Sequence, residues 1–147
     1  MRQTNRRVST MEISDAIEML LGRRETVPKP ARLPTTDEID AAEDALGISF
    51  HPDYRHFQMT ASNVVFGHLE PARLLPETQA YLNLLAMNKK AWSLGLRRDV
   101  LAFCQDNGNY YFITAEGKVG FYDHDDETAD VGDATLADWI VDEWLEG

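Results

Sequence analysis

Apolar residues recur every three or four positions from Ile13 to Leu21, a spacing that predicts an amphipathic helix. Thr10 or Ser14 is expected to cap the start of this helix, and Gly22 to end it. Several prolines follow within a short stretch. Because proline is excluded from the interior of a helix, they predict an extended connector, marked by Pro28, Pro30 and Pro34.

A second helix is predicted from Thr35 or Thr36 to Leu46. Glu38 lies three residues after Thr35, the spacing of a capping box, in which each side chain accepts a hydrogen bond from the backbone of the other residue. Acidic residues in the first turn also complement the helix dipole. Gly47 is expected to end the helix in the left-handed conformation.

Three further elements are predicted in the middle of the chain. A short helix should begin at Pro52, because proline suits the first turn of a helix, and end at Phe57 or Met59. Residues 63–69 contain adjacent β-branched and aromatic residues and predict a strand. Residues 77–92 have helical spacing and predict a longer helix.

The clearest strand pattern lies in the last third of the chain. Apolar and aromatic runs at 100–104, 110–114 and 119–123 predict three strands, and Asn107-Gly108 is a strong hairpin signal between the first two. An acidic loop is predicted over 124–133. A final helix should follow and cover the sheet with an apolar stripe formed by Leu136, Ile140, Val141 and Trp144.

This order of elements predicts an α+β fold, with an antiparallel sheet and a C-terminal three-stranded meander packed against several helices. A chain of 147 residues is in the common size range of one domain. We assign that domain to residues 10–147. Residues 1–9 are expected to form a disordered basic tail.

Charge is unevenly distributed along the chain, and this suggests a function. The net charge is −11, but residues 99–147 alone carry −12, from thirteen acids against Lys118, whereas the first 34 residues carry +3. The negative charge therefore belongs to the segment with the predicted strands. A folded acidic surface is suited to a basic macromolecular partner.

Composition also argues against several classes of partner. Nucleic acid is not expected as the main partner, because phosphate binding needs clustered Lys and Arg, although the basic tail could touch RNA or DNA. No apolar run has the length of a membrane span, so no membrane partner is expected. The single Cys104 fits a reducing compartment, and acids interrupt any signal-like segment after the basic start. We therefore expect a cytoplasmic protein.

The acidic sequence from Asp123 to Glu127 admits three interpretations. It could be a face that docks a basic protein, with charge speeding the encounter. It could hold a divalent cation through its carboxylates and His124, although it lacks the order of an EF-hand loop. It could also be a solvated loop with no binding role.

No catalytic, metal or cofactor site is assigned from the sequence. Asp123 and Asp125 could share a strand face as a paired acid and base, but no nucleophile motif or phosphate loop accompanies them. The four histidines are scattered, and one cysteine is too few for a structural zinc site. Cys104 is expected to be a buried small hydrophobe rather than a reactive thiol.

The aromatic residues divide between the core and candidate contact positions. Tyr54 and Phe57 are three residues apart on one helix face, which favours core packing over a binding pocket. On the strands, Tyr111 faces away from Tyr110. If helices leave that second face uncovered, Tyr111 and Tyr122 would be exposed aromatics of the kind enriched at interface hot spots.

Four segments together resemble the SUKH superfamily, the SMI/KNR-type family of cell-wall assembly regulators and toxin-immunity proteins. Leu33-Pro34 with the helix ending in Leu46-Gly47-Ile48 resembles its opening segment. Phe50-His51-Pro52-Asp53-Tyr54-Arg55-His56-Phe57 resembles its element with Pro, Tyr, Arg and Phe in that order. Phe103 to Asp125 resembles its central hairpin, and Leu136-Ala137-Asp138-Trp139-Ile140 its closing helix.

The resemblance implies an α+β domain that binds other proteins and has no shared catalytic residues. Bacterial members are similar to immunity proteins, and fungal members are regulatory scaffolds. We therefore expect a non-enzymatic immunity protein that neutralises a toxin, such as a basic nuclease domain, by occlusion; a scaffold without a toxin partner is the alternative. The residues expected to contact the partner are Asp123, Asp125, Asp126, Glu127, Asp130, Tyr111 and Tyr122.

Overall fold

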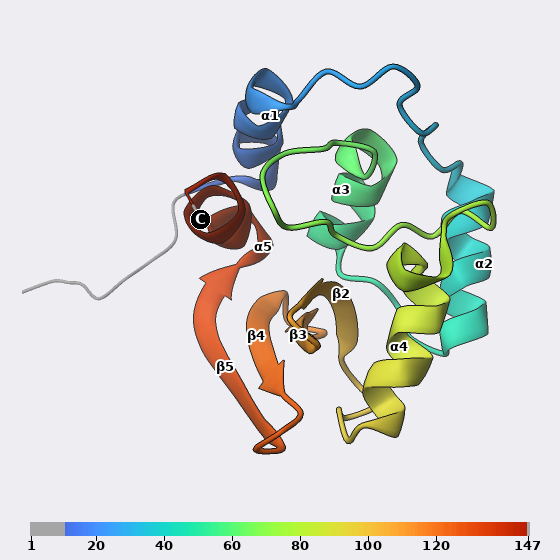
Figure 1. Ribbon diagram of the computed structural model, residues 1–147, viewed down its shortest axis with the longest axis vertical. Helices are drawn as coiled ribbons and strands as arrows, with labels where there is room; N and C mark the ends of the chain where they lie inside the picture. Colours follow the sequence, from blue (N-terminus) through green and yellow to red (C-terminus); the bar gives the residue numbers. More distant parts are fainter. Residues whose placement is uncertain (1–10, 147) are drawn as a thin grey trace, which may run out of the picture.

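Helices from the first part of the chain pack against a sheet from the last part (Figure 1). The computed structural model describes residues 11–146, so the predicted tail at 1–9 lies outside the described residues. The predicted α+β fold with an antiparallel sheet is confirmed. The helices before the sheet are α1 (Ile13–Arg23), α2 (Thr36–Leu46), α3 (Pro52–Ala61), the 3₁₀ helix η1 (Ala80–Leu82) and α4 (Leu84–Ser93).

Local side-chain chemistry explains where α2 begins and ends. The Thr35 hydroxyl accepts a hydrogen bond from the Glu38 N–H at 3.2 Å, and the Glu38 carboxylate accepts one from the Thr35 N–H at 2.9 Å. Gly47 ends the helix with a φ of 71°, which favours glycine. By contrast, α1 follows Glu12, which makes no side-chain capping bond, and it continues one residue past Gly22.

The predicted strand at residues 63–69 is wrong. The segment is a loop, because two of its carbonyl groups accept hydrogen bonds from groups that do not belong to a neighbouring strand. The Val65 carbonyl accepts a hydrogen bond from the Glu25 N–H at 2.7 Å. The Phe66 carbonyl accepts one from the indole of Trp144 at 2.9 Å. Apolar residues in this segment thus fill the core edge without pairing as a strand.

The predicted helix at residues 77–92 begins later than expected. A turn and the short η1 come first, and α4 starts at Leu84. Asn83 causes this boundary, because it is extended and its side chain accepts a hydrogen bond from the Ala86 N–H at 3.0 Å. Asparagine is among the best N-cap residues, and here its capping role interrupts the helical pattern.

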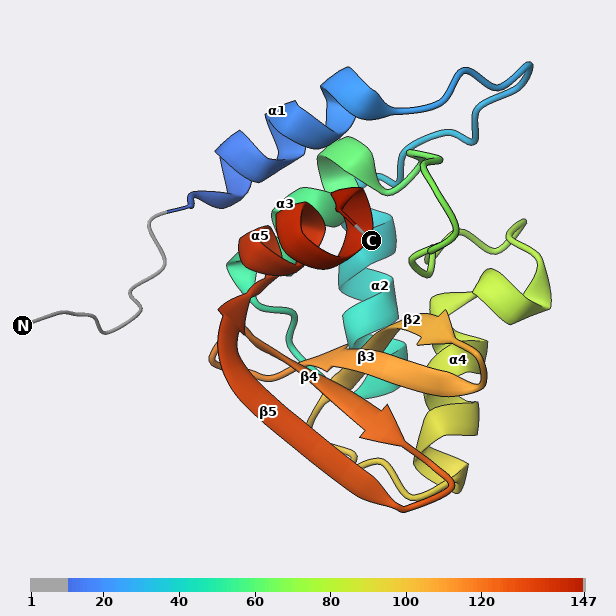
Figure 2. The same cartoon turned by 60° about the vertical axis from the view of Figure 1, so that its left-hand side comes forward.

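The sheet has four antiparallel strands in the order β2-β3-β4-β5. The Asn107-Gly108 hairpin is confirmed: both residues have positive φ, 52° and 85°, as a tight two-residue turn requires. In Figure 2 the sheet lies below α3 and the closing helix, and α4 flanks it near β2. The strands are β2 (Leu101–Asp106), β3 (Asn109–Ile113), β4 (Lys118–Asp123) and β5 (Thr128–Thr135).

Strand β5 is the largest difference from the prediction. The acidic loop expected over 124–133 is a short turn, and its second half pairs with β4 from Asp123↔Thr128 to Gly120↔Val131. This strand could not be predicted from the sequence, because its side chains are exposed on both faces, except for a half-buried Thr135. Without a buried face, the period-two hydrophobic pattern that marks a strand is absent.

A closing helix follows β5 directly. It begins as α5 (Leu136–Trp139) and continues in π-helical turns as η2 (Ile140–Leu145). Thr135 and Asp138 form a second capping box at its start. The predicted apolar stripe is confirmed, since Leu136, Ile140 and Trp144 are buried and Val141 is half-buried.

An aromatic cluster joins this closing helix to α3 and the sheet. Trp139 meets Phe103 edge-to-face, with ring centroids 4.9 Å apart, and Phe103 meets Tyr54 at 6.0 Å. Trp144 packs against Phe57 at 6.1 Å. All five side chains are almost fully buried, so the prediction that Tyr54 and Phe57 belong to the core is confirmed. Buried rings of this size dominate core energetics.

The outer edge of β2 is closed by groups that are not part of a strand. The buried Asn88 side chain donates a hydrogen bond to the Ala102 carbonyl at 2.9 Å and accepts one from the Ala102 N–H at 2.7 Å. The Ala72 N–H donates to the Phe103 carbonyl at 2.7 Å. One amide side chain on α4 thus replaces the backbone of a neighbouring strand.

We expect Asn88→Leu to lower the free energy of unfolding by about 2–4 kcal/mol, because it keeps the branched shape of the side chain but leaves both backbone groups of Ala102 buried and unpaired. Urea denaturation followed by circular dichroism would measure this. Lys89→Ala, at the exposed neighbouring position, should change stability by less than about 0.5 kcal/mol. An Asn88→Leu protein as stable as the parent would contradict the edge-closing role.

Candidate protein-binding site

A groove of about 220 Å³ lies where β3, β4 and β5 meet the closing helix. The strands contribute Tyr111, Val119 and Phe121, and the helix contributes Trp139. Carboxylates from both sides surround this apolar lining. The groove thus combines aromatic rings with negative charge, and its acidic residues are Asp130, Asp138, Asp142 and Glu143.

The floor of the groove is built by cross-strand register. Tyr111 on β3 lies directly opposite Phe121 on β4, and the ring centroids are 4.9 Å apart. The Tyr111 ring also packs against Trp139 at 5.3 Å. Trp139 is buried, whereas Tyr111 and Phe121 are only half-buried. Two strand aromatics therefore remain partly available to a partner above a fixed tryptophan.

The prediction that Tyr122 would be exposed beside Tyr111 is wrong. Register places Tyr122 opposite Tyr110, and directly opposed residues share one face of a sheet. That face is covered from the α4 side, and the Tyr122 hydroxyl donates a hydrogen bond to the Leu94 carbonyl at 2.7 Å. Tyr122 is 2% exposed and belongs to the core. The sequence reasoning missed Phe121, which takes the position expected for Tyr122.

Glu143 ties the groove aromatics to the acidic rim. The Tyr111 hydroxyl donates a hydrogen bond to the Glu143 carboxylate at 3.3 Å. Burial, followed by the negative charges of Glu143 and Asp106, raises the pKa of Tyr111 to about 12. The hydroxyl therefore remains a protonated hydrogen-bond donor above pH 10, where an ordinary tyrosine ionises.

The carboxylates of the groove have different roles. Asp138 is buried and completes the capping box, because its carboxylate accepts a hydrogen bond from the Thr135 N–H at 3.1 Å. Asp130, Asp142 and Glu143 are exposed. Asp138 thus holds the start of the helix in place, and the other three acids place their negative charge at the surface.

A tight acidic turn precedes β5. The Asp123 carboxylate accepts hydrogen bonds from the N–H groups of Asp125 at 3.0 Å and Asp126 at 3.4 Å, which folds the turn on itself. Glu127 has a φ of 53° and ends the turn in the left-handed region. Asp125, Asp126 and Glu127 are exposed, so the turn presents three carboxylates at the start of β5.

We call the exposed acids of the turn and the groove the acidic surface: Asp125, Asp126, Glu127, Asp130, Asp142 and Glu143. Strand β5 connects its two parts, because the turn leads directly into Thr128 and Asp130 lies two residues further along. Within residues 11–146, the arginine ion pairs are made with acids on other elements, by Arg32, Arg55 and Arg97. In this part of the chain, only His124 lies against an acid of the turn, with its Nε2 3.3 Å from the Asp125 carboxylate.

The cation interpretation of the turn gains no support from the geometry. Over the described part of the chain, no three His, Cys, Asp or Glu side chains converge in a way that could hold a metal ion. One carboxylate oxygen of Asp123 already accepts hydrogen bonds from backbone N–H groups, and Nδ1 of His124 lies 2.8 Å from the Asn109 side-chain oxygen.

Cys104 is fully buried, and burial raises the pKa of its thiol to about 12, as expected for a small core residue.

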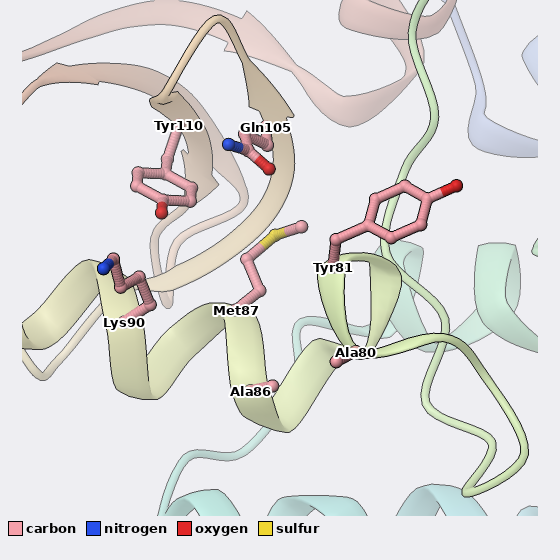
Figure 3. A pocket seen from close by; sticks show the side chains of 7 residues that line it. All are labelled: Ala80, Tyr81, Ala86, Met87, Lys90, Gln105 and Tyr110. Carbon is pink, nitrogen blue, oxygen red and sulfur yellow. The ribbon is translucent and has the colours of Figure 1, made fainter.

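A second hollow, of about 390 Å³, lies between α4 and the β2–β3 hairpin (Figure 3). Met87 and Lys90 line it from α4, and Tyr110 and Gln105 from the strands. The side chain of Tyr81, which is 57% exposed, stands at its rim. Its one charged lining residue is a lysine, so this hollow does not share the negative character of the groove.

A family model described as SMI1-KNR4 cell-wall (SUKH_5) matches residues 13–145. The chain belongs to this SUKH family. The match spans every helix and strand described above, so the resemblance inferred from four short segments is confirmed. The SUKH family includes immunity proteins and is generally non-catalytic.

A solved structure agrees with the family assignment. A crystal structure of a protein from Pseudomonas syringae pv. tomato superimposes with a TM-score of 0.80 at 30% identity, covering 91% of this chain and 99% of that one. No curated protein matches significantly. In the described residues, no helix is both long and apolar enough to cross a membrane.

The SUKH motif around α3 has a structural explanation. Arg55 joins α3 to α2, with its guanidinium 2.7 Å from Asp40 and 3.0 Å from Glu43. Glu43 also accepts a hydrogen bond from the Phe50 N–H at 2.7 Å. Tyr54, next to Arg55, enters the aromatic cluster. The motif therefore positions the core that carries the groove and does not itself line the groove.

We expect Glu143→Gln to lower the pKa of Tyr111 from about 12 towards the ordinary tyrosine value, because it removes a negative charge that opposes the tyrosinate. NMR titration of tyrosine ring carbons would measure it. Asp142→Asn is the control: Asp142 lines the same groove but does not contribute to this shift, so the pKa should stay unchanged. An unchanged pKa in Glu143→Gln would show that Glu143 does not act on Tyr111.

Proposed function

We propose that this SUKH protein is a non-enzymatic, cytoplasmic immunity protein that neutralises a bacterial toxin by binding it through the acidic surface. Family membership supports a protein-binding role, since the SUKH family includes immunity proteins and is generally non-catalytic. The groove lined by aromatic and acidic residues is a candidate place for the contact. Occlusion would be the mechanism, and no group of this chain would need to react.

The observation that carries this proposal is the acid-rimmed aromatic groove, which β5 connects to the acidic turn. Within residues 11–146, the carboxylates of the acidic surface make no ion pair with Arg or Lys, and their field speeds the approach of a basic protein, such as a nuclease domain. Half-buried Tyr111 and Phe121 then offer apolar contact area over Trp139. Aromatic anchors of this kind slow dissociation, so charge and rings act on different steps of binding.

A regulatory scaffold without a toxin partner is the second candidate. Such a protein would use the same fold and could bind through the hollow beside α4, where Lys90 gives the lining the opposite charge. The two candidates differ in which surface contacts the partner. They also differ in gene context, because an adjacent gene for a large multidomain toxin supports immunity.

The test begins with affinity capture of partners by the tagged full chain from its own source organism. Association of the captured protein is then measured by stopped-flow fluorescence over a range of salt concentrations. We expect the rate to fall as salt rises, because screening weakens steering. In the triple variant Asp125→Asn, Asp126→Asn and Glu127→Gln we expect the rate at low salt to drop about tenfold and to lose most of this salt dependence.

A matched variant removes three charges from a distant element. Glu12→Gln, Asp15→Asn and Glu18→Gln change exposed acids on or next to α1, which lies at the other end of the molecule from the β4–β5 turn (Figure 1). Its association rate should stay close to that of the parent. If both triple variants slow association equally, or if salt leaves the parent's rate constant, the acidic surface is not the docking face.

A further inference from the structure

The two outer edges of the sheet differ in whether other groups form hydrogen bonds with them. Asn88 and Ala72 occupy the outer edge of β2, as described above. At the other edge, among the residues that the structure describes, Thr128–Val131 pair only with β4. Figure 2 shows β5 along the outside of the sheet, with no other described element beyond it. One edge of the sheet is therefore closed, and the other is open.

The open edge has the dimensions of a short docking strand. Four consecutive residues, Thr128–Val131, pair in regular register with β4, and the register becomes irregular only after Gly120↔Val131. All four are exposed, and Val131 is 45% exposed. The side chains here are small or short, and Gly132 follows. Another backbone can therefore approach this edge closely.

The charge around this edge indicates what kind of strand fits it. Asp130 stands within the four-residue ladder, the acidic turn Asp125–Glu127 adjoins its first residue, and Asp133 lies just beyond its last. Opposite charges on paired strands stabilise the pairing, and like charges directly opposite each other destabilise it. A strand carrying Lys or Arg therefore complements this edge.

A second copy of this chain fits the edge poorly. In an antiparallel pairing of two such edges, Thr128 of one copy would face Val131 of the other, and the Asp130 side chains would lie near each other. Asp133 of each copy would then approach the acidic turn of its neighbour. With a net charge of −11 on each chain, this contact repels along its whole length.

We propose that the outer edge of Thr128–Val131 pairs with an extended basic segment of a partner protein, which adds a fifth strand to the sheet. Backbone hydrogen bonds supply affinity, and the acids flanking the edge select Lys or Arg side chains. This proposal deepens the proposed function, since it names how a partner would sit on the acidic surface. It also explains why β5 is long and exposed yet regular at its start.

The test uses the full chain and two synthetic peptides of about eight residues in which Arg alternates with Thr. The second peptide has the same sequence and charge but carries an N-methyl group on every backbone nitrogen, which blocks strand pairing along both edges. Binding is measured by NMR titration, and hydrogen exchange reports on the amides of β5. We expect the unmodified peptide to bind at least about tenfold more tightly and to slow exchange in Thr128–Val131.

Variants locate the contact. Asp130→Asn should weaken binding of the unmodified peptide about threefold or more, and Asp15→Asn on α1 should leave it unchanged. Equal affinity of the two peptides would overturn strand addition while leaving charge-based docking intact. No binding of either peptide at millimolar concentration, or a chain that dimerises through β5 in sedimentation experiments, would also overturn this proposal.

Discussion

The edge-to-face contact between Phe103 and Trp139, with centroids 4.9 Å apart, is the contact on which the rest of the molecule depends. Phe103 lies on β2 and also contacts Tyr54 on α3. The contact therefore holds the closing helix against both the sheet and the helices. The same tryptophan also contacts Tyr111, with ring centroids 5.3 Å apart. Its position therefore determines both the core and the floor of the groove. A candidate binding surface that rests on a core residue is rigid, and rigid anchors lose less entropy on binding.

Features set by local chemistry were predictable from the sequence. The Thr35–Glu38 capping box, the left-handed Gly47 and the Asn107-Gly108 turn each depend on interactions within a few residues, and the structure contains all three. Strand β5 was not predictable in this way. Its side chains are exposed, so its pairing depends on backbone bonds to β4 and leaves no hydrophobic period in the sequence. Residues 63–69 show the opposite case: their apolar residues predict a strand, but the segment is a loop that packs Val64 and Leu69 into the core.

The sequence predicted some of the residues of the candidate site, but not the strand register that decides which aromatic residues face it. Tyr111 and Asp130 were identified, and both line the groove. Tyr122, and not Phe121, was predicted beside Tyr111, because the strands were judged by alternation alone. Counting residues back across the Gly117 turn would have paired Ile113 with Val119 and hence Tyr111 with Phe121. A shift of one residue moves every side chain of a strand to the other face, so register decides which aromatics are available to a partner.

The acids near β5 have two physical consequences that reinforce each other. An open strand edge invites pairing with further copies, and charged residues on the edge are a common protection against this. Asp130 and Asp133 supply that protection here, because any contact between two β5 edges brings like charges together. The same charges leave the edge accessible to a strand of opposite sign. Since these side chains are exposed, they cost little stability in the folded chain. The buried Asn88 amide thus closes the β2 edge, whereas the β5 edge stays open and carries the negative charge that suits the basic strand proposed above.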